Sequence, residues 1–107
     1  MIVRRGDVWA AIPDRSAIRD FRNARPFVVL SPPELNDHLH TVIVAPLVTG
    51  AKSAPFRIPL RFKGESAVLV LDQLRTLDKS RFLHRAGTLT PATLKATLTA
   101  LAHTFAP

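Results

Sequence analysis

Arginine supplies the most evident chemistry in this sequence. Eleven of the fifteen basic residues are arginines, and four of them gather in one short polar segment: Arg15, Arg19, Arg22 and Arg25. A guanidinium group binds phosphate oxygens through paired hydrogen bonds and stacks on nucleic-acid bases. Because only eight residues are acidic, the net charge is +7 and the sequence pI is about 11.4. This charge indicates a polyanionic partner, and among nucleic acid, anionic membranes and acidic proteins we favour nucleic acid.

Other patterns that could carry chemistry are weak. The chain has no cysteine, which excludes disulfides, thiolate metal sites and a cysteine nucleophile. His38 and His40 share one side of an extended segment, but no third ligand accompanies them, so a surface loop is favoured over a metal site. His84 and His103 have no evident partner, and the sequence contains neither a glycine-rich phosphate loop nor a Ser/His/Asp arrangement. We therefore expect neither a metal nor a cofactor.

The elements that must position the arginines are predicted to be mostly short strands in one domain. The 107 residues suffice for one hydrophobic core, so we expect a single domain over residues 1–107. Nine prolines and four glycines divide the chain into short segments, without an internal repeat. No apolar run approaches the roughly 18 residues of a membrane span, and the first residues do not resemble a signal peptide. The expected compartment is the cytoplasm.

Hydrophobic alternation and turn residues place these elements. Strands are predicted over residues 7–12, 27–30, 41–47, 56–62, 66–74 and 86–89, with helical turns over 31–36 and 78–82. The polar loop 13–25, which carries the arginine cluster, is long for a compact domain, and such loops are usually functional or disordered. Pro46 predicts a bend or an edge in its strand, and Pro59 predicts an edge strand. Thr90 and Pro91 open a helix with this apolar stripe: Leu94, Leu98, Leu101, Ala102 and Phe105.

Several segments, taken in order, resemble the MazF/PemK (Kid) toxins. They are RGDVW at residues 5–9, RPFVVLSP at 25–32, VIVAPL at 42–47, PF at 55–56 and DQLRTLD at 72–78, followed by Gly87 and the terminal helix. No single segment is specific. The set nevertheless covers nearly the whole chain in the order and spacing of that family.

This resemblance implies a mainly β fold, an SH3-like β-barrel of the CcdB/MazF/Kid type with a C-terminal α-helix, in agreement with the predicted elements. It implies the toxin of a type II toxin–antitoxin system, a sequence-specific endoribonuclease (mRNA interferase) that cleaves single-stranded RNA without a metal by attack of the ribose 2′-hydroxyl. The implied partners are single-stranded RNA and a small acidic, MazE-like antitoxin. The implied assembly is a homodimer.

On this resemblance the catalytic residues are Arg25, Thr49 and Asp72. Arg25, in the RP segment, would stabilise charge on the five-coordinate phosphate and serve as an acid. The family keeps a threonine after the bend proline where this chain has Val48, so Thr49 carries the remaining hydroxyl. Asp72 matches a carboxylate proposed as general base in some members, but their arginine two residues earlier is Val70 here. A general base and a strand-end aspartate bonded to nearby backbone both remain open for Asp72.

The predicted RNA-binding residues are Arg15, Arg19, Arg22, Lys52, Phe56, Gln73 and Arg75. The loop arginines form an electrostatic funnel for the RNA backbone. The donors of Gln73 and Arg75 can read bases or hold phosphate. Phe56 either stacks on a base or packs in the core, and its alternation with Ile58 and Leu60 favours the core.

Two other functions remain open at this point. Val48 and Val70 stand where the family has polar side chains, which favours an RNA-binding barrel with lost or weakened cleavage. A gyrase-poisoning toxin similar to CcdB would share the fold. That family relies on a C-terminal Trp-Gly-Ile ending, whereas this chain ends in Phe-Ala-Pro at residues 105–107. We therefore favour the endoribonuclease.

Overall fold

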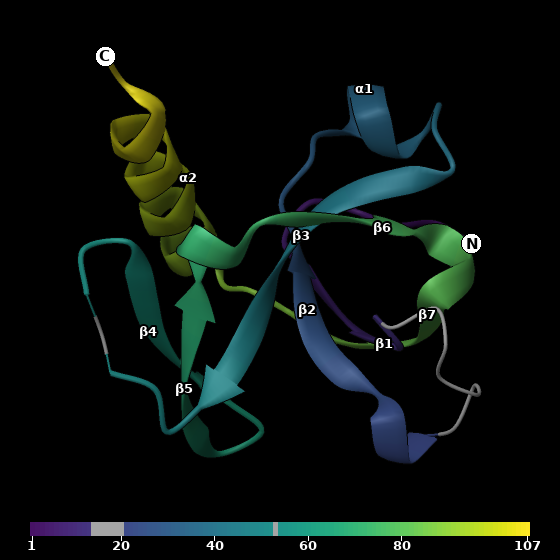
Figure 1. The fold of residues 1–107 in the computed structure, drawn as a ribbon, viewed down its shortest axis with the longest axis horizontal. Helices are drawn as coiled ribbons and strands as arrows, with labels where there is room; N and C mark the ends of the chain where they lie inside the picture. The colour runs from purple at the N-terminus through teal and green to yellow at the C-terminus, as the bar shows by residue number, and fades with distance from the viewer. Residues whose placement is uncertain (14–20, 53) are drawn as a thin grey trace.

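The computed structural model describes residues 1–13, 21–52 and 54–107. Within these ranges the chain forms seven strands: β1 (Asp7–Ala11), β2 (Arg25–Val29), β3 (Thr41–Thr49), β4 (Arg57–Phe62), β5 (Glu65–Val70), β6 (Arg75–Asp78) and β7 (Phe82–Thr88). The helices are α1 (Pro33–Asn36) and α2 (Pro91–Phe105), and the short 3₁₀ turns are η1 (Phe21–Asn23), η2 (Leu71–Gln73) and η3 (Lys79–Arg81). Figure 1 shows α2 at one end of the molecule, beside β4 and β5. The predicted mainly β fold with a C-terminal helix is confirmed.

Strand β3 is the centre of the antiparallel sheet. The strands run in the order β4-β5-β3-β2-β1-β7, and β6 pairs with the first half of β3. Beyond Pro46, β3 exchanges β6 for β5 as its partner, while Pro46 itself lies opposite Phe27 of β2. Pro46 therefore marks a change of partner inside a central strand, and its edge-strand alternative is wrong. Pro59 lies in β4, which ends the strand order, so its predicted edge position is confirmed.

The two end strands of the sheet meet through side-chain packing. In the described ranges no backbone ladder joins β4 to β7, so the sheet remains open in its hydrogen bonds. The Phe62 ring of β4 reaches across to β7, because a Cβ added at Gly87 would lie 3.6 Å from Phe62 Cε1. The Phe62 ring therefore packs beside Gly87 on the opposite edge at a distance that a Cβ would meet as an ordinary van der Waals contact.

The sheet has a hydrophobic cluster on each face. Phe27 and Val29 belong to one cluster and Val28 to the other, because successive strand residues point to opposite faces. The first cluster also holds Trp9, which is 8% exposed and stacks on Phe82 with ring centroids 5.3 Å apart. The predicted core position of Trp9 is confirmed.

The RGDVW segment shapes the turn that receives helix α2. Gly6 has φ of 91°, which favours glycine, and a Cβ there would crowd the Leu94 side chain of α2 at 3.3 Å from Cδ2. Asp7 is buried, accepts a 3.0 Å hydrogen bond from the Arg4 backbone N–H and lies 3.5 Å from Arg85. This segment is therefore structural, and it links β1, β7 and α2.

Helix α2 begins as predicted, but its contact face differs from the predicted stripe. The Thr90 side chain caps the helix by accepting from the Thr93 backbone N–H at 3.2 Å. Leu94 and Leu101 pack on the second cluster, and Thr97 between them is fully buried. Thr97 tolerates burial because its hydroxyl donates to the Thr93 carbonyl at 2.8 Å. The stripe was wrong at Ala102 and Phe105, which are exposed.

Candidate active site and nucleic-acid interface

Arg25 is the first residue of β2, and its guanidinium is held by backbone groups alone. Its Nη1 donates to the Ala24 carbonyl at 2.9 Å and to the Arg22 carbonyl at 3.3 Å. The side chain is exposed, and no carboxylate pairs with it in the part of the chain that the structure describes. Within the described residues, the cation is thus oriented by backbone carbonyls and is not neutralised by a carboxylate.

A cleft of about 510 Å³ lies beside this guanidinium, and we call it the Arg25 cleft. The start of β2, the end of β3 and the turn between β4 and β5 enclose it. Lys63 and Gly64 turn the chain there with φ of 50° and 79°. The lining residues are Arg25, Pro26, Leu47, Val48, Thr49, Phe62, Lys63 and Glu65. The cleft therefore joins Arg25 and Thr49, two of the three predicted catalytic residues.

The side chains of Val48 and Thr49 project from opposite faces of β3. The antiparallel ladder pairs Phe27 with Pro46. Continued by two residues toward the start of β2 and the end of β3, this register places Arg25 opposite Val48. Val48 therefore shares the sheet face of Arg25, while the Thr49 hydroxyl belongs to the other face. Val48 is 39% exposed, and Thr49 is exposed as well, so neither side chain packs in the core.

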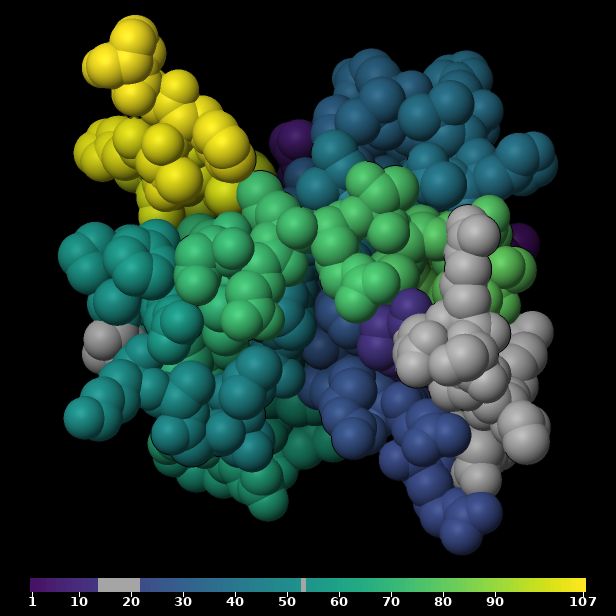
Figure 2. Space-filling model, in the orientation of Figure 1, coloured from purple at the N-terminus to yellow at the C-terminus, as the bar shows by residue number. Residues whose placement is uncertain are grey.

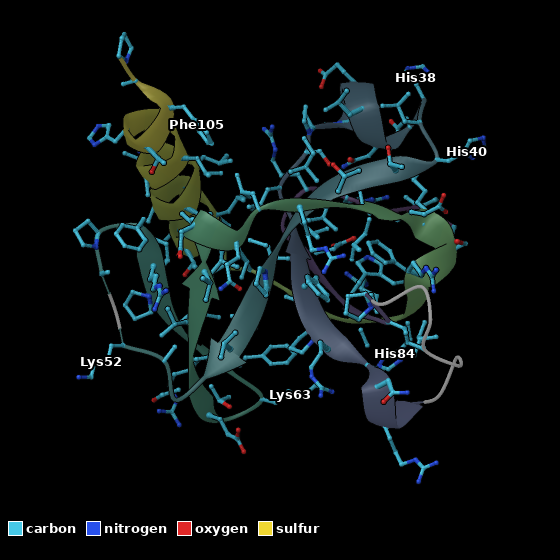
Figure 3. All side chains as sticks on the ribbon, in the orientation of Figure 1. His38, His40, Lys52, Lys63, His84 and Phe105 are labelled. Carbon is cyan, nitrogen blue, oxygen red and sulfur yellow. The ribbon has the colours of Figure 1, made fainter. Side chains whose placement is uncertain are left out.

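Sequence reasoning missed two charged residues of the Arg25 cleft. Lys63 and Glu65 flank Gly64 at the tip of the β4–β5 hairpin and line the cleft opposite Arg25. Lys63 Nζ lies 5.5 Å from the centroid of the Phe62 ring, a cation–π contact. Figure 3 shows Lys63 between β5 and β2, whereas Lys52 lies on the outer loop before β4. The sequence predicted a turn at Lys63-Gly64. That this turn lies beside β2 follows only from the tertiary arrangement of the strands.

Asp72, the third predicted catalytic residue, lies on η2 and does not line the Arg25 cleft. Arg57 donates to it through two hydrogen bonds, Nε to Oδ1 and Nη2 to Oδ2, both 3.2 Å. Arg57 stands directly opposite Val70 in the β4–β5 ladder. Arg57 thus places a guanidinium on Asp72 from the neighbouring strand, where the resemblance to some family members implied an arginine at position 70, and sequence reasoning missed Arg57.

The ion pair sets the charge state of both partners. The hydrogen bond from Arg57 lowers the pKa of the Asp72 carboxyl below its ordinary value. The same contact raises the pKa of the Arg57 guanidinium. Asp72 is thus an ionised carboxylate whose two oxygens are already engaged, and its proton affinity is reduced rather than enhanced.

Phe56 precedes β4 and is exposed, so the expectation that it packs in the core is wrong. Its side chain is 40% exposed, because regular β pairing begins only at Arg57 and the alternation of β4 does not extend to it. Its backbone is fixed by the Leu71 N–H, which donates to the Phe56 carbonyl at 3.1 Å. The Arg57 guanidinium carbon lies 5.8 Å from the Phe56 ring centroid.

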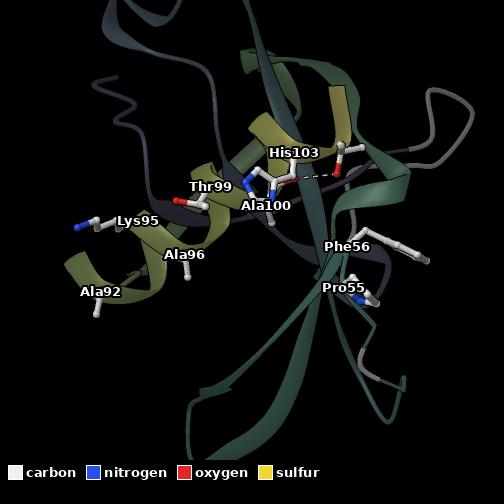
Figure 4. A pocket seen from close by; sticks show the side chains of 9 residues that line it. Pro55, Phe56, Ala92, Lys95, Ala96, Thr99, Ala100 and His103 are labelled. Atoms are coloured by element: carbon white, nitrogen blue, oxygen red, sulfur yellow. Dashed lines mark hydrogen bonds between the residues drawn. The ribbon is translucent and has the colours of Figure 1, made fainter. Parts of the chain in front are cut away.

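A groove of about 720 Å³ runs between Phe56 and the outer side of α2, as Figure 4 shows. We call it the Phe56 groove. Its only ionisable lining residues are Lys95 and His103. The remaining walls are Pro55, Phe56, Ala92, Ala96, Thr99, Ala100 and Thr104.

The other predicted RNA contacts are distributed over the surface. Arg75 is exposed on β6 and donates to the Pro13 carbonyl at 3.3 Å, where the arginine-rich loop begins. Gln73, Lys52 and Arg22 are also exposed. Arg15 and Arg19 lie outside the described residues. The RNA-binding roles of all seven residues stay predictions.

The described ranges contain no cluster of three His, Cys, Asp or Glu side chains placed to hold a metal ion. Among the helices of these ranges, none has the length and apolar character to span a membrane.

The fold and the cleft define a class of protein: a small basic β domain with a C-terminal helix and an arginine-lined cleft at the strand ends. A family model described as the PemK-like, MazF-like toxin of type II toxin–antitoxin systems matches residues 4–105. The Endoribonuclease MazF of Staphylococcus epidermidis is 34% identical over 88 residues, covering 75% of this chain and 72% of that protein. The chain belongs to the PemK/MazF toxin family, as its sequence predicted.

Solved structures agree with this assignment. A mycobacterial endoribonuclease in complex with its cognate antitoxin has a TM-score of 0.78 and 25% identity, covering 94% of this chain and 92% of that one. MazF from Deinococcus radiodurans has a TM-score of 0.75 and 25% identity, covering 97% and 96%. The MazF-type fold is therefore confirmed, and the MazF assignment is favoured over a CcdB-like gyrase poison.

Proposed function

We propose that this toxin cleaves single-stranded RNA in the Arg25 cleft by attack of a ribose 2′-hydroxyl on the adjacent phosphate. The observation that carries the proposal is the cleft itself, because Arg25, which pairs with no carboxylate in the described residues, lines it together with Lys63 and Thr49. An RNA phosphate gains negative charge on its equatorial oxygens as it becomes five-coordinate, and cations held in place stabilise that charge. The mycobacterial and staphylococcal relatives named as endoribonucleases support the same activity.

Arg25 and Thr49 act on the phosphate. The guanidinium binds the equatorial oxygens with its remaining N–H groups, since Nη1 is the one nitrogen engaged by carbonyls of the described residues. The Thr49 hydroxyl donates a further hydrogen bond to phosphate. Val48 contributes shape but no donor, so the site has one hydroxyl fewer than the family pattern.

Glu65 is the carboxylate placed to accept the proton of the 2′-hydroxyl. It lines the Arg25 cleft, whereas Asp72 is engaged by Arg57 at a different site. The 2′-oxygen bonds to phosphorus, the bond to the 5′-oxygen breaks, and the leaving 5′-oxygen takes a proton from Arg25 or water. The products are a 2′,3′-cyclic phosphate and a 5′-hydroxyl. No metal takes part in these steps.

A cleavage assay with chelator tests this function. Purified protein is incubated with a long single-stranded RNA in EDTA, and the new ends are mapped and analysed chemically. We expect short-sequence cleavage with cyclic phosphate ends, and no reaction where the 2′-hydroxyl at the cut site is replaced by hydrogen. The Arg25→Ala protein, purified identically, controls for contaminating nucleases. Cleavage that requires added Mg²⁺ contradicts the proposal.

The proposed assembly is a cytoplasmic homodimer held inactive by a small acidic antitoxin. The net charge of +7 and the exposed arginines suit an acidic polypeptide that covers the RNA-binding surface. The relative solved with its cognate antitoxin supports such a partner. We expect an acidic antitoxin segment to compete with RNA, and binding that leaves RNA affinity unchanged would argue against a shared surface.

A further inference from the structure

A second cleft, of about 490 Å³, neighbours the Arg25 cleft, and we call it the Arg61 cleft. Thr49 at the end of β3 lines the Arg25 cleft, and the next residue, Gly50, lines the Arg61 cleft. The β4–β5 hairpin is shared in the same way, since Phe62 lines the first cleft and Arg61 lines the second. The two clefts therefore lie next to each other at one end of the sheet.

One row of paired residues connects Arg25 with the strand that carries Arg61. The β2–β3 register places Arg25 opposite Val48. The next two ladders pair Val48 with Val68 of β5, and Val68 with Pro59 of β4. Paired residues share a face of the sheet, and Arg61 shares the face of Pro59 because it lies two residues further along β4. Arg25 and Arg61 therefore belong to one face, roughly 15 Å apart at about 4.8 Å per strand and 3.3 Å per residue.

Arg61 is held in the same manner as Arg25. Its Nη2 donates to the Gly64 carbonyl of the hairpin turn, and no carboxylate pairs with it in the described ranges. The side chain is exposed, and none of the described residues that line the Arg61 cleft is acidic. At both clefts a backbone carbonyl thus orients a guanidinium whose charge stays available for an anion.

The surface between the two arginines is apolar. Val48 is 39% exposed, Pro59 is exposed, and Val68 is buried between them. In Figure 2 the teal surface at the end of β3 meets the blue surface of β2, with the dark green hairpin below them, and all three are open to solvent on this face. Cations separated by apolar surface suit a single nucleic-acid strand, in which phosphates alternate with sugars and bases.

We propose that the Arg61 cleft binds a backbone phosphate of the RNA substrate, a few nucleotides from the cleaved bond. This inference rests on the proposed RNA cleavage and adds a binding subsite to it. We favour RNA over a separate acidic polypeptide because a strand bound at Arg25 continues along the same face to Arg61. Because Arg61 does not line the Arg25 cleft, it should contribute to substrate binding and leave the chemical step unchanged.

Removing the charge of single phosphates tests this subsite on the full-length chain. Substrates with one mapped cut site carry a neutral methylphosphonate at each flanking position in turn, and initial rates give kcat and KM separately. For wild type we expect one flanking position where this change raises KM about fivefold, as for one exposed ionic contact. Arg61→Ala should raise KM by the same factor on intact RNA, lose its sensitivity at that position alone and retain kcat.

Matched variants separate phosphate binding from support of the hairpin. Arg61→Lys keeps the charge and should keep most of the affinity, while Arg61→Gln keeps the length and should behave like Arg61→Ala. Each phosphate contact to a single strand contributes about 0.7 to the slope of log affinity against log salt, so Arg61→Ala should reduce that slope by about 0.7. Arg4→Ala, whose side chain lines neither cleft, should retain the sensitivity of wild type at every position. A loss of kcat without a change of KM in Arg61→Ala, or unchanged methylphosphonate sensitivity, overturns the inference.

Two further measurements distinguish this inference from its alternatives. If wild type does not cleave RNA, the proposed function fails first. Fluorescence anisotropy with the same methylphosphonate series then decides phosphate binding: a loss of affinity at one position that disappears in Arg61→Ala supports it, and a uniform affinity overturns it. Polyglutamate serves as the probe for an acidic polypeptide. If Arg61→Ala weakens polyglutamate binding but not RNA binding, the cleft belongs to an acidic protein partner and the inference is wrong.

Discussion

The Arg25 cleft and the group formed by Phe56, Arg57 and Asp72, which we call the Phe56 platform, lie near opposite ends of β4 and differ in how their charges are matched. The cleft has Arg25 and Lys63 facing a single carboxylate, Glu65, and no ion pair joins them in the described ranges. At the platform the one cation, Arg57, is bound to Asp72 through both oxygens. Unmatched cations suit a phosphate whose charge grows during reaction, whereas a neutral pair beside an exposed ring suits a base.

On the proposed function, this contrast separates the residues that act on the phosphate from Phe56, which is predicted to contact RNA. A group that acts mainly in the transition state changes kcat, whereas a group that binds substrate and transition state alike changes KM. Substitutions in the cleft should therefore lower kcat, and substitutions at the platform should raise KM.

The largest effect is expected for Arg25→Ala. Loss of a positioned cation at a five-coordinate phosphate typically costs about a hundredfold or more in kcat. Because the side chain is exposed and its hydrogen bonds within the described residues go to two carbonyls, the melting temperature should barely change. Initial-rate cleavage and thermal melts measure both quantities. Arg4→Ala, which also removes an exposed arginine, is the charge-matched control and should retain activity.

Glu65→Gln and Asp72→Asn test the contrast directly. Glu65→Gln should lower kcat about a hundredfold, because the proton acceptor is lost. Asp72→Asn should keep kcat and raise KM, since it only loosens Arg57. Glu34→Gln, an exposed glutamate on α1, is the control. If instead Asp72→Asn removes kcat and Glu65→Gln does not, the general base is at the platform and our division of roles is wrong.

The sequence predicted those features of the two regions that depend on neighbouring residues, and it missed those that depend on residues far apart in the chain. The first strand and the Thr90–Pro91 helix start follow from local signals, and both are present. Arg25 and Thr49 were identified through the family resemblance. Glu65 was missed because the hairpin tip reaches β2 only through the folding of β3 between them.

The incorrect predictions for Phe56 and for the contact face of α2 have local structural causes. Strand alternation and helical periodicity do not reveal these causes. Phe56 continues the apolar pattern of β4 but lies one residue before the ladder begins, so it turns outward. Arg57 replaces a missing arginine at position 70 from across the ladder, a substitution visible only once the register is known. Thr97 is polar in sequence yet buried, because its hydroxyl bonds to the preceding helical turn.

A smaller effect of opposite sign is expected for Val48→Thr. The residue is 39% exposed and shares the sheet face of Arg25, so the new hydroxyl reaches the cleft without being buried. A hydrogen bond to a charged group contributes about 1.5–3 kcal/mol at most, and at an exposed site we expect a several-fold rise in kcat. Val48→Ala controls for the change of shape. An unchanged rate in Val48→Thr would mean that Thr49 already fills this role.

The smallest effect concerns the stability that the platform pair contributes. The pKa of Asp72 is lower in the folded protein than its ordinary value, through the hydrogen bond from Arg57. A carboxyl with a lowered folded pKa stabilises the fold above its unfolded pKa, and that contribution disappears as pH falls through the folded pKa. Asp72→Asn should therefore melt slightly below wild type at neutral pH, and the two melting temperatures should converge in acid. Because both side chains are partly exposed to solvent, the difference should also shrink in high salt. Thermal melts of wild type and Asp72→Asn from neutral to acid pH, at low and high salt, measure it. A gap that widens in acid would show that the pair does not hold Asp72 ionised, and the matched-charge description of the platform would then be wrong.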